Sequence, residues 1–230
     1  MYWEEKKTDK PFKVPDDIVD VAYKINCKCL PLEHAMSLSG AIQKALPWIS
    51  DEEKAGIHLI HGAESGNGWM RPEDPANELL HLSRRTRMTL RLPKERVDDA
   101  NELTGKTLKV DGYDLSVGES QVKLLSTQST LFSRYVVSME TESEDDFLNR
   151  IYKELTSLEI QIHKIMCGKT HVLQGHYGDI FTRSVMLAEL KPEDSVKVQQ
   201  EGLGEGRQLG CGLFIPHKGI APVKESEEDL

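Results

Sequence analysis

The spacing of apolar residues in the first half of the chain changes between the period of a strand and that of a helix. Apolar side chains recur at roughly alternate positions over 18–27 and at helical spacing over 35–46, where Pro47 ends the helix. Pro93 is placed to open a second helix, and Gly105 follows its end. The pattern predicts strands at 18–27, 56–61, 79–92 (continuous, or broken by a bulge) and 107–117 (one strand, or a hairpin at Asp111 and Gly112). It predicts helices at 35–46 and 93–105. The order β-α-β-β-α-β is typical of a ferredoxin-like module.

The second half of the chain repeats this order. Strands are predicted at 131–138, 160–166, 179–190 and 211–216, and helices at 143–158 and 191–200. The segment 92–97 is similar to 190–196, about one small domain further along the chain. We therefore predict an α+β fold of two tandem ferredoxin-like (RRM-like) βαββαβ modules, the second with a C-terminal glycine-rich loop. The expected divisions are an N-terminal extension at 1–12, modules at 13–118 and 119–222, and an acidic tail at 223–230.

Composition narrows the class of protein. Hydrophobic residues make up 38% of the 230 residues and charged residues 29%, which suits a globular protein with a real core. No window approaches the roughly 20 apolar residues of a membrane span, and residues 1–13 lack a signal sequence, so we expect a cytoplasmic protein without a membrane partner. The spacing of Cys27, Cys29, Cys167 and Cys211 predicts reduced thiols and no metal or cofactor.

The distribution of charge matters more than its formal total of −9. Most of the negative charge lies in two short segments, 140–146 and 224–229. By contrast, the segment 84–96 holds six Arg and Lys residues and a single Glu. A local basic surface is what a phosphate backbone requires, so the acidic total does not exclude a nucleic-acid partner.

A glycine-rich segment near the C-terminus is the most informative motif. Five glycines fall within eleven residues: Gly202, Gly204, Gly206, Gly210 and Gly212. Their backbone N–H groups could approach an anion closely, or the segment could simply be a long flexible connection. The order helix, glycines, strand argues against a dinucleotide site, which needs strand, glycines, helix. A nucleotide-hydrolase phosphate loop at Gly168-Lys169-Thr170 is also excluded, because its first glycine is replaced by His163.

The spacing Gly202-x-Gly204 and Gly210-x-Gly212 before an apolar strand resembles the glycine-rich loop of CRISPR-associated repeat-processing endoribonucleases of the RAMP superfamily. Four longer segments are similar to the MYXAN-subtype branch: 30–49, 56–69, 82–97 and 202–220. The resemblance spans essentially the whole chain. It implies binding of CRISPR repeat RNA and one cut per repeat, which yields mature crRNAs.

The resembled family cuts RNA without a metal. The neighbouring 2′-hydroxyl attacks the scissile phosphate, leaving a 2′,3′-cyclic phosphate and a 5′-hydroxyl. An alternative interpretation within the superfamily is a non-catalytic RNA-binding subunit of a CRISPR effector complex. A third, from another class, is a small-molecule-binding ferredoxin-like regulator. Expected partners are repeat RNA and subunits of an effector complex, with the chain a monomer or weak dimer.

Histidine suits the proton transfers because its ordinary pKa of about 6.5 is close to working pH. In several members of the resembled family a catalytic histidine lies in or near the first helix, so His34 is the predicted catalytic residue; the alternative is an exposed first-turn histidine. His61 is the second choice, and a spacing of three sends His58 to the opposite face of its strand. Residues that could assist are Tyr23, Ser37 and Lys44.

Basic residues are expected to bind the RNA backbone. Alternation along the predicted strand sends Arg85, Arg87 and Arg91 to one face and Arg84 to the other; the alternative is a solvated strand face. The complete RNA-binding prediction is Arg84, Arg85, Arg87, Arg91, Lys169, Arg183, Gly202, Gly204, Gly206, Arg207, Gly210 and Gly212. Trp69 could stack on a base, whereas core packing is the better interpretation of Phe214.

Overall fold

The computed structural model describes residues 12–61, 79–175 and 177–218. Trp69 and the acidic tail, both named in the sequence predictions, lie outside these residues. The first half forms β1 (Ile18–Asn26), β2 (Cys29–Pro31), α1 (Ala35–Ala45), β3 (Gly56–Ile57), β4 (Leu79–His81), β5 (Arg87–Pro93), α2 (Val97–Ala100), β6 (Thr107–Val110) and β7 (Tyr113–Leu124). The second half forms β8 (Leu131–Val137), α3 (Glu144–Ser157), β9 (Lys164–Gly175), β10 (Gly178–Ala188), α4 (Pro192–Glu201) and β11 (Ile215–Pro216).

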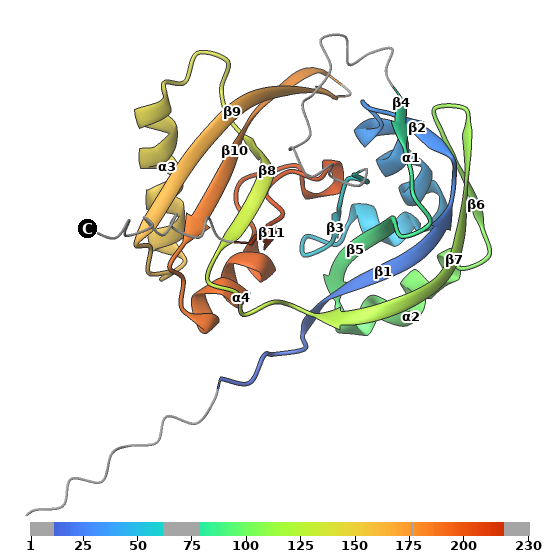
Figure 1. Cartoon of the computed structure of the whole chain (residues 1–230), viewed down its shortest axis with the longest axis horizontal. Helices are drawn as coiled ribbons and strands as arrows, with labels where there is room; N and C mark the ends of the chain where they lie inside the picture. The colour runs from blue at the N-terminus through green and yellow to red at the C-terminus, as the bar shows by residue number, and fades with distance from the viewer. Residues whose placement is uncertain (1–11, 62–78, 176, 219–230) are drawn as a thin grey trace, which may run out of the picture.

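Two antiparallel sheets organise the molecule (Figure 1). The first sheet has the order β3-β5-β1-β7-β6 and the second the order β11-β8-β10-β9. In the first sheet β1 lies between β5 and β7, and in the second sheet β8 lies between β10 and β11. In both halves the first strand of the β-α-β-β-α-β series therefore lies between the third and the last. Strands β2 and β4 form a separate two-stranded sheet. The predicted α+β class is therefore confirmed, with both halves built on one strand arrangement.

Alternation along β1 separates the core from an open face of the first sheet. Val19, Val21 and Tyr23 are buried in a core that also takes residues of α1. The residues between them point to the other side of the sheet, because successive side chains of a strand alternate. On that side Asp20 is the cross-strand partner of Arg91. The open face of the first sheet therefore carries polar and charged side chains.

The second sheet is built in the same way. Phe147, Ile151 and Leu155, spaced by four along α3, are fully buried in its core. The hydroxyl of Ser143 caps α3 by accepting a hydrogen bond of 3.1 Å from the N–H of Asp146. Three acidic residues, Glu144, Asp145 and Asp146, form the first turn of α3, which lies within the helix predicted at 143–158.

The strand predicted over 79–92 is interrupted. A turn separates β4 from β5, and it is closed by hydrogen bonds from Thr86 N to Ser83 O (3.0 Å) and from Ser83 N to Thr86 Oγ1 (3.2 Å). Arg84 and Arg85 lie in this turn. The prediction that their side chains alternate along a continuous strand is therefore wrong.

Other boundaries also differ from the prediction. The strand expected at 211–216 contracts to β11, because Gly210 and Gly212 adopt φ of +81° and +67°, which no strand uses. Strand β9 begins later than expected and runs on to Gly175. Strand β7 continues to Leu124, beyond the module boundary placed at residue 118, so the connection to the second half starts after it.

Candidate functional site

A cleft of about 860 Å³ lies between the open faces of the two sheets. One wall is formed by β1, β5, the last part of β7 and the segment after β3. The other wall is formed by β8, β11 and the two residues after β11. Gly210 and Leu213 of the glycine-rich loop complete the lining. The cleft is therefore assembled from both halves of the chain.

Positive charge dominates the lining of this cleft. Its cationic side chains are Arg87, Lys123, Arg134 and Lys218. Among the described lining residues Asp20 is the acidic one, and its carboxylate is already paired with a buried arginine. Cations on facing walls suit a polyanion such as an RNA backbone.

His34, the predicted catalytic residue, lies at the N-cap of α1 with only 2% of its surface exposed. Its Nδ1 lies 2.8 Å from the carbonyl oxygen of Pro31, and its Nε2 accepts a hydrogen bond of 3.2 Å from the N–H of Ile60. The ring is therefore the Nδ1–H tautomer, with both nitrogens engaged by backbone. Burial lowers the pKa of His34 and keeps it neutral. This geometry disfavours direct proton transfer by His34.

Both His58 and His61 line the cleft. The prediction that they face opposite sides of a strand is wrong, because β3 ends at Ile57 and alternation stops there. His58 is largely buried, and its Nε2 lies 3.7 Å from Oδ1 of Asp20. His61 remains open to solvent; surrounding protein atoms remove part of its hydration and, with the positive charge of Arg134, lower its pKa. His61 is thus a neutral, accessible imidazole at neutral pH.

The three residues proposed to assist catalysis lie elsewhere. Tyr23 is fully buried, and its hydroxyl donates to the carbonyl of Ala100 at 2.8 Å. Ser37 donates to a carboxylate oxygen of Asp111 at 2.5 Å. Lys44 is exposed in the last turn of α1. None of the three is among the residues that line the cleft.

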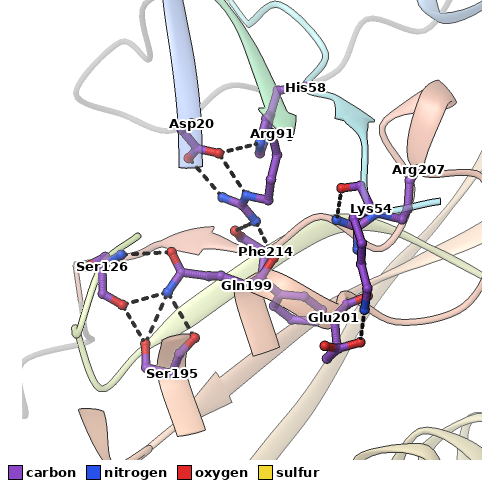
Figure 2. A network of polar contacts seen from close by, with 10 residues as sticks. All are labelled: Asp20, Lys54, His58, Arg91, Ser126, Ser195, Gln199, Glu201, Arg207 and Phe214. Atoms are coloured by element: carbon purple, nitrogen blue, oxygen red, sulfur yellow. Dashed lines mark hydrogen bonds and ion pairs between the residues drawn. The ribbon is translucent and has the colours of Figure 1, made fainter. Parts of the chain in front are cut away.

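The predicted RNA-binding arginines separate into different environments. Arg84, Arg85 and Arg87 are exposed, and Arg87 lines the cleft. Arg91 is the opposite case: it is 0% exposed and bonded to protein groups on all sides (Figure 2). Its predicted role in contacting RNA is therefore corrected. A buried arginine of this kind holds protein segments together.

The predicted cations of the second half also differ from one another. Lys169 is exposed on β9. Arg183 faces α3, where its guanidinium lies 5.8 Å from the ring centroid of Phe147 and donates to the carbonyl of Glu142 at 2.8 Å. Arg183 therefore lies on the helix side of the sheet, away from the cleft.

The glycine-rich loop folds against itself. A Cβ on Gly212 would lie 2.0 Å from the carbonyl oxygen of Leu203, and one on Gly202 would lie 2.8 Å from the carbonyl oxygen of Gly212. Both glycines have positive φ, as do Gly204, Gly206 and Gly210. Close backbone approach therefore explains part of the glycine content, whereas Gly210 lines the cleft and Gly204 is exposed.

The same loop joins the two halves of the molecule. Arg207 donates to the carbonyl of Lys54 at 3.0 Å and to that of Glu201 at 2.6 Å. Burial lowers the pKa of Arg207 to about 10, so it stays protonated at neutral pH. Gln208 donates to the carbonyl of Ile49 at 2.8 Å. The side chain of Arg207 is thus committed to protein contacts.

A second groove, of about 700 Å³, follows the other side of the loop. Its lining includes four carboxylates: Asp51, Glu52, Glu53 and Glu205. This charge opposes a nucleic-acid backbone. The first cleft is therefore the candidate site.

Several residues of the candidate site were missed by the sequence analysis. Arg134, Lys123, His217 and Lys218 line the cleft from three different segments. They form no local motif, so spacing alone carries no signal for them. The ring of His217 lies 5.7 Å from that of Phe132 (centroid to centroid), which places this imidazole at the wall contributed by β8.

The described part of the chain holds neither a cluster of metal ligands nor a membrane-spanning helix. Residues 12–61, 79–175 and 177–218 contain no group of three or more His, Cys, Asp or Glu side chains able to hold a metal ion. None of the helices in these ranges has both the length and the hydrophobicity of a membrane span.

Comparisons with known proteins agree on one family. The family model described as Cas6 Crispr matches residues 19–219. The CRISPR-associated endonuclease Cas6 of Myxococcus xanthus (strain DK1622) is 28% identical over 206 residues, which cover 90% of this chain and 84% of that protein.

Two solved structures share the fold. A CRISPR associated protein Cas6 superposes with a TM-score of 0.58 at 12% identity, covering 87% of this chain and 100% of that chain. A Cas6-related protein from Pyrococcus furiosus superposes with a TM-score of 0.53 at 13% identity, covering 86% and 98%. Because the family model spans most of the sequence and both sheets, this chain belongs to the Cas6 family.

Proposed function

We propose that this chain is an endoribonuclease that cuts precursor CRISPR RNA within its repeats to give mature crRNAs. Family membership supports this function, since the related Myxococcus protein is named an endonuclease. The observation that carries the proposal is the cleft between the sheets, where cations from both walls meet a solvent-accessible imidazole. Polyanion binding and proton transfer are the two requirements of RNA cleavage.

We infer that each half is a ferredoxin-like module, so that RNA lies between two such modules. The strand orders support this assignment, because β3-β5-β1-β7 and β9-β10-β8-β11 place the four strands of each half in the same relative order. Helices cover one face of each sheet and leave the other to the cleft (Figure 1). A polynucleotide entering the cleft then contacts both modules.

The exposed turn between β4 and β5 provides an entry to the cleft. Arg84 and Arg85 lie in this turn, and Arg87 follows at the start of β5 on the cleft wall. A backbone passing from the turn into the cleft would meet cations in succession. Gly210, in the cleft lining, is the glycine of the loop that remains open to RNA, whereas Gly204 lines the acidic second groove.

His61 is our choice for the proton acceptor in place of His34. It is exposed at the cleft, whereas both ring nitrogens of His34 are held by backbone. His34 then acts as a positioning residue, because its bond to Ile60 fixes the segment that carries His61. Arg134, whose charge acts on His61, is placed to stabilise the extra negative charge of the transition state.

The proposed reaction requires no metal in its chemical step. His61 removes the proton from the 2′-hydroxyl, and the 2′-oxygen attacks the adjacent phosphorus. The bond between phosphorus and the 5′-oxygen breaks, and the departing oxygen takes a proton from water. The products are a 2′,3′-cyclic phosphate and a 5′-hydroxyl.

The test is cleavage of a labelled CRISPR repeat RNA, taken from the genome that encodes this chain, with and without EDTA. Wild-type protein should cut the repeat once in EDTA, and His61→Ala should lose cleavage but keep binding. His163→Ala, at an exposed position before β9, is the matched control. Tight binding without cleavage by the wild type would support the non-catalytic subunit instead, and loss of cleavage in EDTA would contradict the proposed chemistry.

A further inference from the structure

Arg91 forms a fully buried connection between the two halves of the molecule, in addition to the contacts of Arg207 and Gln208. Its Nε donates to Oδ1 of Asp20 at 2.8 Å and its Nη2 to Oδ2 at 2.9 Å, a bidentate pair within the first sheet. Burial opposes the charged form of Asp20, but Arg91 and His58 outweigh it and hold the pKa of the carboxyl below its usual range. The pair is therefore ionised throughout the neutral range.

The remaining side of the guanidinium points into the second half (Figure 2). Its Nη1 donates to the carbonyl of Gln199 at 3.0 Å and to that of Phe214 at 2.9 Å. These carbonyls belong to the last part of α4 and to the residue before β11. One planar group thus joins β1 and β5 of the first sheet to two segments of the second module.

The acceptor on α4 is itself held in place. The amide of Gln199 donates to the carbonyl of Ser126 at 2.6 Å and accepts from the N–H of the same residue at 3.1 Å (Figure 2). It also donates to the carbonyl of Ser195 at 2.9 Å. Ser126 lies in the connection between the two halves. The carbonyl of Gln199 that accepts from Arg91 is therefore held in place by hydrogen bonds to this connection and to α4.

Asp20 connects the hydrogen bonds of Arg91 to the cleft. It lines the cleft together with His58, whose Nε2 lies 3.7 Å away. On the opposite wall, β11 follows directly on Phe214. A shift of the guanidinium would therefore move both walls relative to each other, because its partners belong to opposite sides.

We propose that Asp20 and Arg91 are positioning residues that set the separation of the two cleft walls, so that His61 and Arg134 act on the same phosphate. The catalytic part of this inference rests on the proposed function. Lysine cannot replace the arginine, because a single ammonium lacks the planar fork that serves the carboxylate and both carbonyls at once. Misplacing catalytic groups by a small distance costs rate more than affinity.

The experiment compares Arg91→Lys with Arg150→Lys. Arg150 makes the same kind of bidentate pair, with Glu142, and donates to the carbonyl of Val137, but all of these lie within the second module. Each variant loses the bidentate hydrogen bonds of one guanidinium to a carboxylate and keeps the positive charge. Single-turnover cleavage of the repeat RNA is measured beside the Kd of a fully 2′-O-methylated repeat, and calorimetry reports unfolding of the RNA-free proteins.

Arg91→Lys should slow single-turnover cleavage by about tenfold or more while the Kd changes by less than about threefold. It should also split one unfolding transition into two, whereas Arg150→Lys keeps a single transition and a near wild-type rate per folded molecule. Wild-type cleavage by Arg91→Lys, or two transitions already in the wild type, would overturn the proposal. Should Arg91→Lys not fold, Asp20→Asn decides by the same criteria.

The cleavage and unfolding measurements together distinguish a failure of this inference from a failure of the proposed function. If the wild type binds repeat RNA but never cuts it, the proposed function fails. The unfolding transitions still decide whether Arg91 couples the two modules. If the wild type cuts and Arg91→Lys cuts equally well, only the positioning role fails.

Discussion

The N–H of Ile60 donates a hydrogen bond of 3.2 Å to Nε2 of His34. The other ring nitrogen lies 2.8 Å from the carbonyl oxygen of Pro31. The imidazole therefore connects the start of α1 to the segment that carries His58 and His61. Both ring nitrogens are therefore engaged, one by the buried N–H of Ile60 and the other by the half-buried carbonyl of Pro31.

Substitution of His34 should affect stability more than catalysis. His34→Ala is expected to lower the free energy of unfolding by about 1–3 kcal/mol, because the buried N–H of Ile60 loses its acceptor. Its single-turnover rate per folded molecule should fall far less than that of His61→Ala, for which loss of a general base predicts about 10²–10⁴-fold. Urea unfolding and single-turnover cleavage measure the two effects. A His34→Ala protein of wild-type stability and no activity would restore His34 as the catalytic residue.

Acidification should destabilise the fold below the ordinary pKa of histidine. Burial lowers the pKa of both His34 and His58 in the folded state, so the unfolded chain binds protons that the fold does not. Their contribution to stability is complete above about pH 6.5 and is lost toward lower pH, at up to about 1.4 kcal/mol per unit for each ring. Urea unfolding at pH 7.5, 6.0 and 5.0 measures this slope. His34→Asn should make it shallower, and a stability that rises on acidification contradicts the account.

The exposed turn between β4 and β5 should contribute phosphate contacts if RNA enters the cleft there. Replacing Arg84 and Arg85 together by Ala should weaken repeat binding and reduce the slope of log K against log salt by about 1–2. Lys153→Ala is the control, because this exposed lysine lies on α3, which covers the helix side of its sheet. Affinity measurements from low to high salt report the slope. An unchanged slope would remove the turn from the binding surface.

Two glycines of the C-terminal loop should respond very differently to alanine. A Cβ on Gly212 would meet the carbonyl of Leu203 at 2.0 Å, and that backbone is held by the bond from Leu203 N to Gly212 O at 3.1 Å. Gly212→Ala should therefore cost more than about 3 kcal/mol or prevent folding. At Gly204 a Cβ would meet no described atom within 4 Å, so only the positive φ of +66° is penalised, at about 1–2 kcal/mol. Urea unfolding compares the two, and equal losses would contradict the packing role of Gly212.

Local patterns predicted much of the fold. The alternation of β1 and the four-residue spacing of α3 reflect burial on one face, which is written into neighbouring residues. Residues 83–87 are all polar, which is compatible with a bulge in the predicted strand, but the turn closed by Ser83 and Thr86 depends on hydrogen bonds that the spacing of apolar residues does not reveal. The shortening of β3 depends on pairing with β5 at Gly56 and Ile57 alone, which no local signal reveals.

The glycine spacing, the longer segments similar to the resembled family and the repeated order of elements predicted the family and the α+β class, because all three are properties of contiguous sequence. Which arginines are exposed and which are buried was decided by the tertiary structure. Arg87 reaches the cleft, whereas Arg91, four positions later, is enclosed by carbonyls of Gln199 and Phe214. The guanidinium of Arg91 is buried by groups that lie more than a hundred residues away along the chain. Its burial is therefore determined only when the two halves pack together.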